Sequence, residues 1–224
     1  MVTTIRKQSD RVARRRAKTR ESLLAAAYAL MSEHGVEDTS VRDVTDRADI
    51  GYGSFFSHFD SKEELVLCLT DCLVNNLGHR NDVATSDIKG ERPEEVICTS
   101  MRLVIRELIT SPIWNWLLLR PDLLVDRLRS GFRWFGRRDM DAAIKSGHFK
   151  LTSDQIEIAH KTLIWVLAGC AKDIADGVSQ KDNEAFYTEL VMRAMGIKAE
   201  DAHDLTQKQL PNLPPIEIDF TFAQ

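Results

Sequence analysis

The chain has 224 residues, of which 43% are hydrophobic and 29% charged, with a net charge of −4. This composition suits a soluble globular protein, and no apolar run approaches the roughly 20 residues that a membrane-spanning helix needs. Four scattered cysteines are too few for a disulfide framework, and the N-terminus lacks the apolar segment of a secretory signal. We therefore expect a cytoplasmic protein without a membrane partner.

The charge is unevenly distributed along the chain. The first twenty residues hold eight basic side chains and one acidic one, a net charge of +7, which leaves −11 for the remainder. A basic segment ahead of an acidic body is what DNA binding by one end would require. The alternative is a solvated, disordered tail. We interpret residues 1–16 as a basic arm in which Arg14, Arg15 and Arg16 neutralise phosphates or enter a minor groove.

After the arm, a helix is predicted from about Thr19 to His34, where Gly35 provides a C-terminal stop. Apolar residues recur along one side of this helix at helical spacing: Leu23, Leu24, Ala27, Leu30 and Met31. Such a stripe is typical of a buried face. This first helix is therefore expected to hold the following pair of helices in place.

Two short helices joined by a tight turn are predicted next. Ser40 is a good N-cap for a helix that runs to about Ala48. Asp49 falls where the chain must reverse, and Asp tolerates the left-handed conformation that such a corner often needs. A second helix is expected from Gly51 to about His58. Eight residues, a sharp turn and a short second helix is the spacing of a helix-turn-helix.

This run resembles the DNA-binding domain of TetR-family transcriptional regulators. The resemblance rests on an ordered set of segments near the N-terminus: Arg20-Glu-Ser-Leu-Leu-Ala-Ala-Ala27, Glu33-His-Gly35, Thr39-Ser-Val-Arg-Asp-Val44, Gly53-Ser-Phe-Phe56, His58-Phe59 and Ser61-Lys-Glu-Glu-Leu65. It covers roughly residues 17–77 and fades beyond them. It implies an all-α protein with an N-terminal three-helix helix-turn-helix DNA-binding domain, residues 17–79, and a C-terminal helical domain for effector binding and dimerisation, residues 80–224.

In a helix-turn-helix, the second helix enters the major groove and its N-terminal residues reach base edges. Tyr52 offers a hydroxyl and a ring, which can hydrogen-bond phosphate or base or contact a thymine methyl. Gly51 and Phe56 lack the hydroxyls that TetR-like proteins usually carry at these positions. Phe55 and Phe59 are expected to pack in the core rather than to touch DNA. Besides the three arginines of the arm, the expected DNA contacts are Thr39, Ser40, Arg42, Gly51, Tyr52, Ser54, Phe56, His58 and Lys62.

The remainder of the chain also reads as helical. A fourth helix is expected from about Ser61 to His79, followed by a polar boundary loop at residues 80–92. Further helices are predicted by proline and capping signals at residues 93–110, 113–119, 121–146, 152–175, 182–195 and 199–209. We expect about nine or ten helices. Residues 211–222 alternate apolar and polar side chains, which suits an extended segment laid against the body.

A small-molecule site is expected between the middle helices, because TetR-like proteins usually enclose one there. On the helix at residues 121–146, apolar side chains recur at i, i+4, i+8 and i+11: Leu124, Leu128, Phe132 and Phe135. Such a stripe is more often plain core than a ligand site. The aromatic-rich composition of the region would suit an apolar or aromatic effector. The candidate ligand-binding residues are Met101, Trp114, Leu117, Leu128, Phe132, Phe135 and Trp165.

Residues 163–170 are apolar all round, so that their helix must be covered on more than one side. Exposed, they would form a patch too large for a monomer. With the next helix they would make a four-helix contact with a second copy, which matches the TetR dimer and presents two recognition helices to a palindromic operator. The candidate dimerisation residues are Leu163, Val166, Leu167, Cys170, Phe186, Leu190 and Ala194.

Enzyme signatures are absent from the sequence. It contains no P-loop, dinucleotide fingerprint, His-Glu-x-x-His or nucleophile elbow. Cys68 and Cys72 lie one helical turn apart, but no nearby His or Cys pair completes a zinc site; buried thiols are commoner than the redox pair that they could form. We therefore expect no catalytic residue, metal or cofactor. Five arginines at residues 127–138 are expected to form a solvated, salt-bridged face.

The sequence thus predicts a homodimeric, ligand-responsive DNA-binding regulator, most often a repressor, whose partners are double-stranded operator DNA and a small-molecule effector. One alternative is an enzyme or carrier that uses the aromatic cavity and keeps a vestigial DNA-binding head, against which the basic arm argues. The other is an architectural DNA-binding protein without an effector, or an activator without a ligand.

Overall fold

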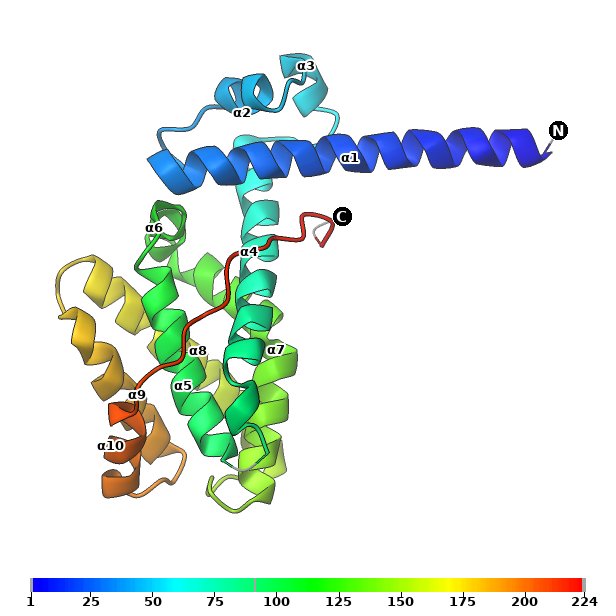
Figure 1. Ribbon diagram of the computed structural model, residues 1–224. Coiled ribbons are helices and arrows are strands. Elements are labelled where there is room, and N and C mark those ends of the chain that lie inside the picture. The colour runs from blue at the N-terminus through cyan, green and yellow to red at the C-terminus, as the bar shows by residue number, and fades with distance from the viewer. Residues whose placement is uncertain (1, 91, 223–224) are drawn as a thin grey trace. The chain divides into compact units, whose positions relative to one another are not determined.

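The computed structural model describes residues 2–90 and 92–222, and within residues 2–10 only the course of the helix (Figure 1). In this described part the structure contains ten α-helices, three short 3-10 helices and no strand, which confirms the all-α prediction. The chain forms two compact units. Unit 1 comprises Met1–Leu73 with Ile218–Gln224, and unit 2 comprises Val74–Glu217.

Unit 1 is built on α1 (Val2–His34), which starts well before the predicted Thr19. The segment that was interpreted as an arm is therefore helical from Val2. It contains neither Gly nor Pro and is rich in Arg, Lys and Ala, which are favourable residues in a helix interior. The predicted end of the helix is confirmed, since Gly35 follows α1 with a φ of +86°.

The helix-turn-helix of unit 1 consists of α2 (Val41–Arg47) and α3 (Tyr52–Phe55). Ser40 caps α2 as predicted, because its hydroxyl accepts a hydrogen bond from the Asp43 amide while the Asp43 carboxylate accepts one from the Ser40 amide. Asp49 adopts the left-handed conformation, with a φ of +55°, which confirms its predicted place at the corner. α3 has only four residues, and the chain continues to Phe59 in turns.

The core of unit 1 confirms which aromatic residues are buried. Phe55 and Phe59 are fully buried, with ring centroids 5.6 Å apart. They share this core with the apolar stripe of α1 and with the first turns of α4 (Lys62–Ala84). The stripe and α4 contribute Leu23, Leu24, Ala27, Met31, Leu65 and Leu69. Burial of this cluster fixes the two helices of the helix-turn-helix against α1.

Unit 2 begins within α4, which runs to Ala84 rather than to His79. A 3-10 helix at Ser86–Ile88 follows. The predicted loop at residues 80–92 is therefore wrong over its first half. The polar side chains that suggested a loop lie on the inner face of the helix, where Asn81 and Thr85 are buried.

The other helices of unit 2 begin and end close to the predicted positions. They are α5 (Pro93–Leu108), α6 (Pro112–Leu118), α7 (Pro121–Lys145), α8 (Ile156–Ala175), α9 (Glu184–Ala194) and α10 (Ala199–Gln207), with 3-10 turns at Ser153–Gln155 and Lys181–Asn183. α5 packs against α7, α8 and α9, and α7 runs along α8. Among the residues that the structure describes, no helix has the length and apolar character that crossing a bilayer requires.

The chain after α10 is extended. Its first part, residues 208–217, lies against unit 2, and Figure 1 shows this segment (red) crossing α5 toward α4. The prediction of an extended segment laid against the body is confirmed for residues 211–217, whereas the residues from Ile218 onward group with unit 1.

Candidate DNA-binding surface and effector cavity

The recognition helix α3 presents an aromatic pair to solvent. Tyr52 and Phe56 are 52% and 49% exposed, and their rings meet edge to face at a centroid distance of 5.5 Å. Phe55, between them in sequence, points into the core. Gly51 and Ser54 are exposed beside the pair. Four of the predicted DNA contacts are therefore accessible on α3 and on the residues that flank it.

Some of the remaining predicted DNA contacts are exposed, and others already form hydrogen bonds within the protein. Arg42 is exposed, with its Nε 3.9 Å from Asp46, and the Ser40 hydroxyl is engaged in the cap of α2. Thr39 is buried and its hydroxyl donates to the Gly35 carbonyl at 2.8 Å. This hydrogen bond engages the hydroxyl in the turn after α1, and the phosphate contact of Thr39 stays a prediction. Lys62 donates to the Glu37 carbonyl at 3.4 Å.

The predicted DNA contacts Arg16 and His58 also take part in hydrogen bonds that hold unit 1 together. An Arg16 Nη2 donates to the Ser57 carbonyl at 3.0 Å, and an Arg20 Nη1 donates to the His58 carbonyl at 2.9 Å. Arg20 also lies over the Phe59 ring, 4.2 Å from its centroid. Sequence reasoning missed this role for Arg20, since nothing in its spacing distinguishes a partly buried arginine from a solvated one.

His58 is half-buried, and its Nδ1 is buried without a hydrogen-bond partner. Burial, together with the positive charges of Arg16 and Arg20, lowers the pKa of His58 below 6.5. At neutral pH the imidazole is therefore uncharged, and the side chain is less suited to binding phosphate than the sequence suggested.

An open groove in unit 1 runs between α1 and the helix-turn-helix. Its lining residues are Val12, Arg15, Arg16, Thr19, Asp49, Ile50, Gly51, Ser54, Ser57 and His58. Two arginines of the predicted arm thus stand across the groove from the start of α3, held there by a helix. Arg14 is exposed on the same stretch of α1.

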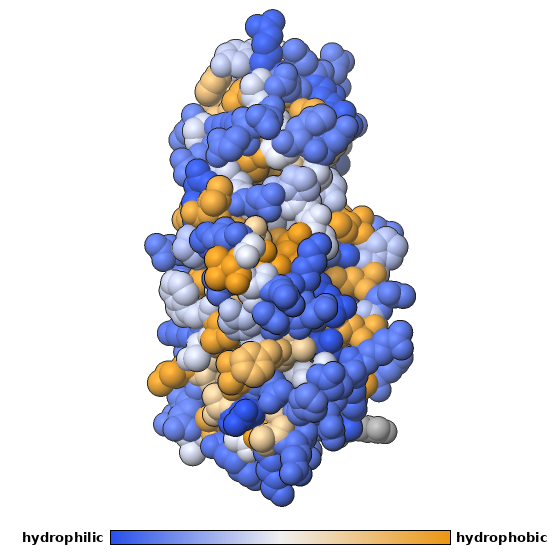
Figure 2. Space-filling model, turned by 90° about the vertical axis from the view of Figure 1, so that its left-hand side faces the viewer, coloured by the Kyte–Doolittle hydropathy of each residue, from blue (hydrophilic) through white to orange (hydrophobic). Residues whose placement is uncertain are grey.

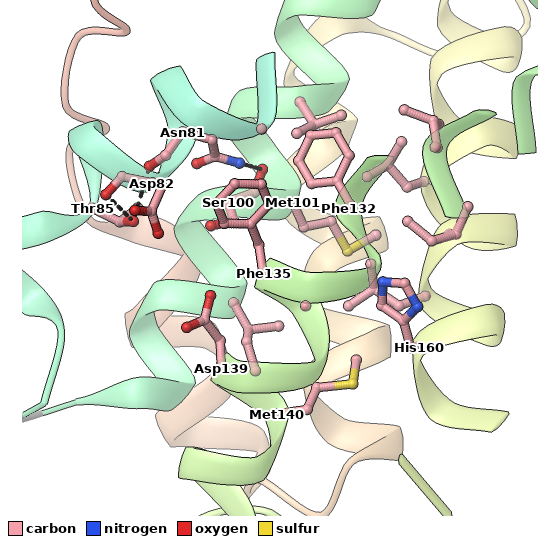
Figure 3. A pocket seen from close by; sticks show the side chains of 18 residues that line it. Asn81, Asp82, Thr85, Ser100, Met101, Phe132, Phe135, Asp139, Met140 and His160 are labelled. Carbon is pink, nitrogen blue, oxygen red and sulfur yellow. Dashed lines mark hydrogen bonds between the residues drawn. The ribbon is translucent and has the colours of Figure 1, made fainter. Parts of the chain in front are cut away.

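A cavity of about 50 Å³ lies inside unit 2, between α4, α5, α7 and α8. Four of the predicted ligand-binding residues line it, namely Met101, Leu128, Phe132 and Phe135 (Figure 3). Trp114 and Leu117 do not line it, because α6 buries both in the surrounding core. Trp165 does not line it either, because this side chain points out of α8 and is 49% exposed.

The cavity also has a polar wall that the sequence did not reveal. Asn81 is 3% exposed; its Nδ2 donates to the Ser100 carbonyl at 3.3 Å, while its Oδ1 is buried with no hydrogen-bond partner in the described structure. His160 faces it from α8 (Figure 3). Burial lowers the pKa of His160 below 6.5, so that the ring is neutral at neutral pH. The signal that could have revealed it is the spacing of Asn81 and Thr85, which lie four residues apart.

The edge of the cavity is charged. Asp82 of α4 and Asp139 of α7 both lie 2.7 Å from Arg138 Nη2, and Lys89 also binds Asp82. Burial would raise the pKa of Asp82, but its bonds to Lys89 and Arg138 outweigh burial and lower it. Burial raises the pKa of Asp139, against the influence of Arg138. The salt bridges predicted for the arginine face of α7 are found at Arg129, Arg137 and Arg138, the last of which is 33% exposed.

The predicted dimerisation residues fall into two groups. Some are buried inside unit 2, and others are exposed on the outer faces of α8 and α9. Leu163 and Leu167 line the cavity and Cys170 is fully buried, and the role of these three residues in a dimer interface stays a prediction. Val166 is half-buried. Exposed apolar or small side chains do lie on the outer faces of α8 and α9: Ile158, Trp165, Phe186, Leu190 and Ala194. Figure 2, which views the side where α9 and α10 lie, shows apolar groups among charged ones.

The described residues offer little other site chemistry. No group of three or more His, Cys, Asp or Glu side chains among them is placed to hold a metal ion. None of the four cysteines, all of which lie in the described residues, forms a disulfide, and burial raises the pKa of Cys98 and of Cys170 to about 12. Such thiols are poor nucleophiles at neutral pH.

Two family models match the chain. Residues 23–69 match "Bacterial regulatory proteins, tetR family", and residues 92–208 match "Tetracyclin repressor-like, C-terminal domain". The HTH-type transcriptional repressor KstR2 of Rhodococcus jostii is 26% identical over 159 residues, which are 64% of this chain and 74% of that protein. KstR2 of Mycobacterium tuberculosis is 47% identical over 57 residues, which are 25% of this chain and 28% of that protein.

Solved structures show the same fold. RolR in complex with the ligand resorcinol has a TM-score of 0.80 at 24% identity, covering 90% of this chain and 100% of that one. RolR without ligand has a TM-score of 0.74 at 22% identity, covering 86% and 99%. The second family model alone spans just over half of the chain. The chain therefore belongs to the TetR family and is a ligand-responsive, DNA-binding transcriptional regulator rather than an enzyme.

Proposed function

We propose that the protein is a homodimeric repressor that binds a palindromic operator through α2 and α3 and leaves it when a small hydroxylated aromatic compound occupies the cavity of unit 2. The observation that carries the effector part is the buried, unpaired Asn81 Oδ1 in a cavity whose walls are mainly apolar. A buried acceptor without a partner costs free energy, which a ligand that donates a hydrogen bond recovers.

The walls of the cavity favour a ring. Phe132 and Phe135 from α7 and Met101 from α5 line it, and aromatic and thioether groups pack well against aromatic ligands. Its volume of about 50 Å³ is small beside the 300–1,000 Å³ of typical ligand sites, which favours a small ligand over a long acyl chain. RolR, whose fold is similar, binds resorcinol, a ring with two hydroxyl groups. This likeness supports a phenolic effector here.

The DNA-binding part rests on the exposed aromatic pair of α3 and on the arginines of α1. Tyr52 and Phe56 offer ring faces and one hydroxyl to base edges, and Arg14 and Arg15 offer charges to phosphates. Contacts with base edges determine which DNA sequence is bound, and contacts with phosphates fix the position of the protein along the duplex. A half-site read by so short a helix is expected to cover only a few base pairs.

A second copy is proposed to cover the outer faces of α8 and α9. An exposed row containing Ile158, Trp165, Phe186 and Leu190 is the kind of surface that homodimers bury. A twofold axis through this face places two copies of α3 for a palindrome.

Release follows from differential affinity between two states. An effector that binds more tightly when the two heads are spaced wrongly for the operator shifts the population of dimers away from DNA. α4 is the natural carrier of this change, because it contributes Asn81 to the cavity and begins in unit 1.

The test is selection of binding sites by the purified protein from random duplexes at two salt concentrations. An enriched palindrome is expected, and resorcinol is expected to release the protein from it where benzoate and a long-chain fatty acid do not. Binding with a steep salt dependence but no enriched sequence would instead indicate an architectural protein. An enriched palindrome from which no phenol releases the protein would refute the effector class alone.

A further inference from the structure

The recognition helix and the turns that follow it, residues 51–59, have an unusual set of side chains for a segment that reads DNA. Their sequence is Gly-Tyr-Gly-Ser-Phe-Phe-Ser-His-Phe. Direct readout in the major groove usually relies on bidentate hydrogen bonds, from Arg or Lys to guanine and from Asn or Gln to adenine. None of these four residue types occurs in the segment. Its exposed side chains, at Tyr52, Ser54, Phe56 and Ser57, offer hydroxyl groups and aromatic rings instead.

The two exposed rings are held in place by contacts within unit 1. The Phe56 ring meets the Tyr52 ring edge to face, and it also meets the fully buried Phe55 ring edge to face at a centroid distance of 5.2 Å. Phe56 is therefore anchored on the core of unit 1 although half of its surface is exposed. Rings that are fixed in this way lose little side-chain freedom on binding, so that they provide contact area at a low entropic cost.

The turn after α3 is also held from α1. Arg16 Nη2 donates to the Ser57 carbonyl at 3.0 Å, and Arg20 Nη1 donates to the His58 carbonyl at 2.9 Å. A helix of four residues has few hydrogen bonds of its own and leaves its last carbonyls without helical partners. The two arginines satisfy carbonyls in the turn and fix the segment that carries the ring pair.

Gly53 removes a side chain from the exposed surface of α3. Glycine is unfavourable within a helix. A Cβ at Gly53 would have no neighbour within 4 Å among the described residues, and its φ is not in the left-handed region. Neither crowding nor backbone conformation in unit 1 therefore requires a glycine here. What a glycine does allow is the close approach of another molecule to the backbone, next to the ring pair.

An aromatic ring has one base-specific apolar partner in the major groove, which is the C5 methyl group of thymine. The corresponding position of cytosine carries only a hydrogen atom. The hydroxyl groups of the segment add little discrimination, because a hydroxyl both donates and accepts and can bond to either base pair. The apolar contacts are therefore the part of α3 that can distinguish one sequence from another.

We propose that the protein recognises each operator half-site through the methyl groups of thymines, which Tyr52 and Phe56 contact in the major groove. This inference deepens the proposed function and rests on it. Each half-site should contain thymine at one or two positions that α3 covers. Operator affinity should then depend on a group that takes part in no hydrogen bond.

The first test replaces single thymines of the selected operator by deoxyuridine, which keeps the base pair and removes only the methyl group. Fluorescence anisotropy measures the affinity of the unmodified chain. At one or two positions in each half-site the affinity should fall about 3- to 5-fold, the factor expected for one buried methyl group. Replacement in both half-sites should lower it about 10- to 25-fold. At the other thymines the change should stay below about twofold.

Loss of affinity at no position would overturn the proposal. So would a similar small loss at every position, because the methyl groups would then act through the deformability of the duplex. These measurements need no variant of the protein, so that they decide the matter even if a substitution prevents folding.

The second test asks which side chain contacts the methyl group. At each sensitive position the ratio of affinities for the thymine and deoxyuridine operators should fall to near one in Phe56→Ala or in Tyr52→Ala. Arg14→Ala is the matched control, since Arg14 is an exposed, expected phosphate contact. It should weaken binding to both operators and leave the ratio unchanged. A full ratio in both aromatic variants would overturn the proposal, because the methyl group would then be contacted elsewhere.

Gly53→Ala tests the close approach of the DNA. Alanine favours a helix, so that the thermal unfolding temperature should stay the same or rise, while operator affinity should fall at least about 5-fold. Unchanged affinity would show that the groove does not lie against this part of α3, and the proposal would be wrong. An enriched operator without methyl dependence would refute this inference and leave the proposed function in place. If no sequence is enriched, the proposed function itself fails and the inference fails with it.

Discussion

Arg138 Nη2 donates a hydrogen bond of 2.7 Å to Asp82 Oδ1 and so joins α7 to α4 at the edge of the cavity. The same guanidinium binds Asp139, and Lys89 binds Asp82 from the chain that follows α4. The charged groups at the edge are thus mutually satisfied. The unmet hydrogen-bonding capacity lies further along the wall, at Asn81 Oδ1. This contrast indicates that the edge holds the helices together and that Asn81 is where a ligand gains specificity.

Asn81→Leu should therefore separate stability from effector binding. Removing a buried acceptor without a partner is expected to leave the ligand-free protein equally stable or to stabilise it by about 1–3 kcal/mol. The same change should lower the affinity for a phenolic effector at least 10-fold. Thermal unfolding and calorimetric titration measure the two quantities. Thr85→Val, at the residue that follows α4 and also lines the cavity, serves as a control, and an equal loss of affinity there would contradict a special role for Asn81.

Tyr52→Ala is expected to weaken specific operator binding by about 1–3 kcal/mol, the range for a good base contact, while the oligomeric state stays unchanged. The exposure of Tyr52 on α3 is the reason, since nothing in the core depends on its ring. Tyr52→Phe keeps the ring and separates the hydroxyl contact from the apolar one. Fluorescence anisotropy on operator and on unrelated duplexes measures the effect. If binding to both duplexes fell equally, Tyr52 would be a phosphate contact rather than a reader of sequence.

Local chemistry made much of unit 1 predictable. Ser40 with Asp43, the corner at Asp49 and the stop at Gly35 each depend on a few neighbouring residues, and all three are found as expected. The expectation that Phe55 and Phe59 pack in the core is also confirmed.

Tertiary context decided the rest. The polar residues at the end of α4 resemble a loop in the sequence. α4 nevertheless continues through them, because they face a cavity rather than solvent. In α8 the apolar residues surround the helix, so that periodicity could not say which side faces inward. The structure places Leu163 inside and Trp165 outside. Pairing such as Arg20 with the His58 carbonyl joins residues 38 positions apart and leaves no local signal.

The proposed dimer can be tested with two exposed tryptophans. Trp165→Asp places a charge in the face of α8 and α9, which should convert the dimer to a monomer at micromolar concentration because burying an unpaired charge is costly. Trp134→Asp makes the same chemical change on α7, where the side chain is 66% exposed. This control should remain dimeric. Sedimentation velocity distinguishes the two species, and dissociation of the Trp134 variant instead would move the interface to α7.

His160 gives a prediction about pH. Burial lowers its pKa in the folded protein below 6.5, with Arg129 and Arg133 acting in the same direction and Glu157 against them. As the pH falls below 6.5, the unfolded chain takes up a proton at this residue and the folded chain does not, so that the free energy of unfolding falls. His160→Gln removes this contribution. Between pH 7.5 and pH 5.5 the unfolding temperature should therefore fall less in the variant than in the unmodified protein. An equal fall in both would mean that the buried imidazole is protonated within the fold, and the neutral polar wall assigned to the cavity would then be wrong.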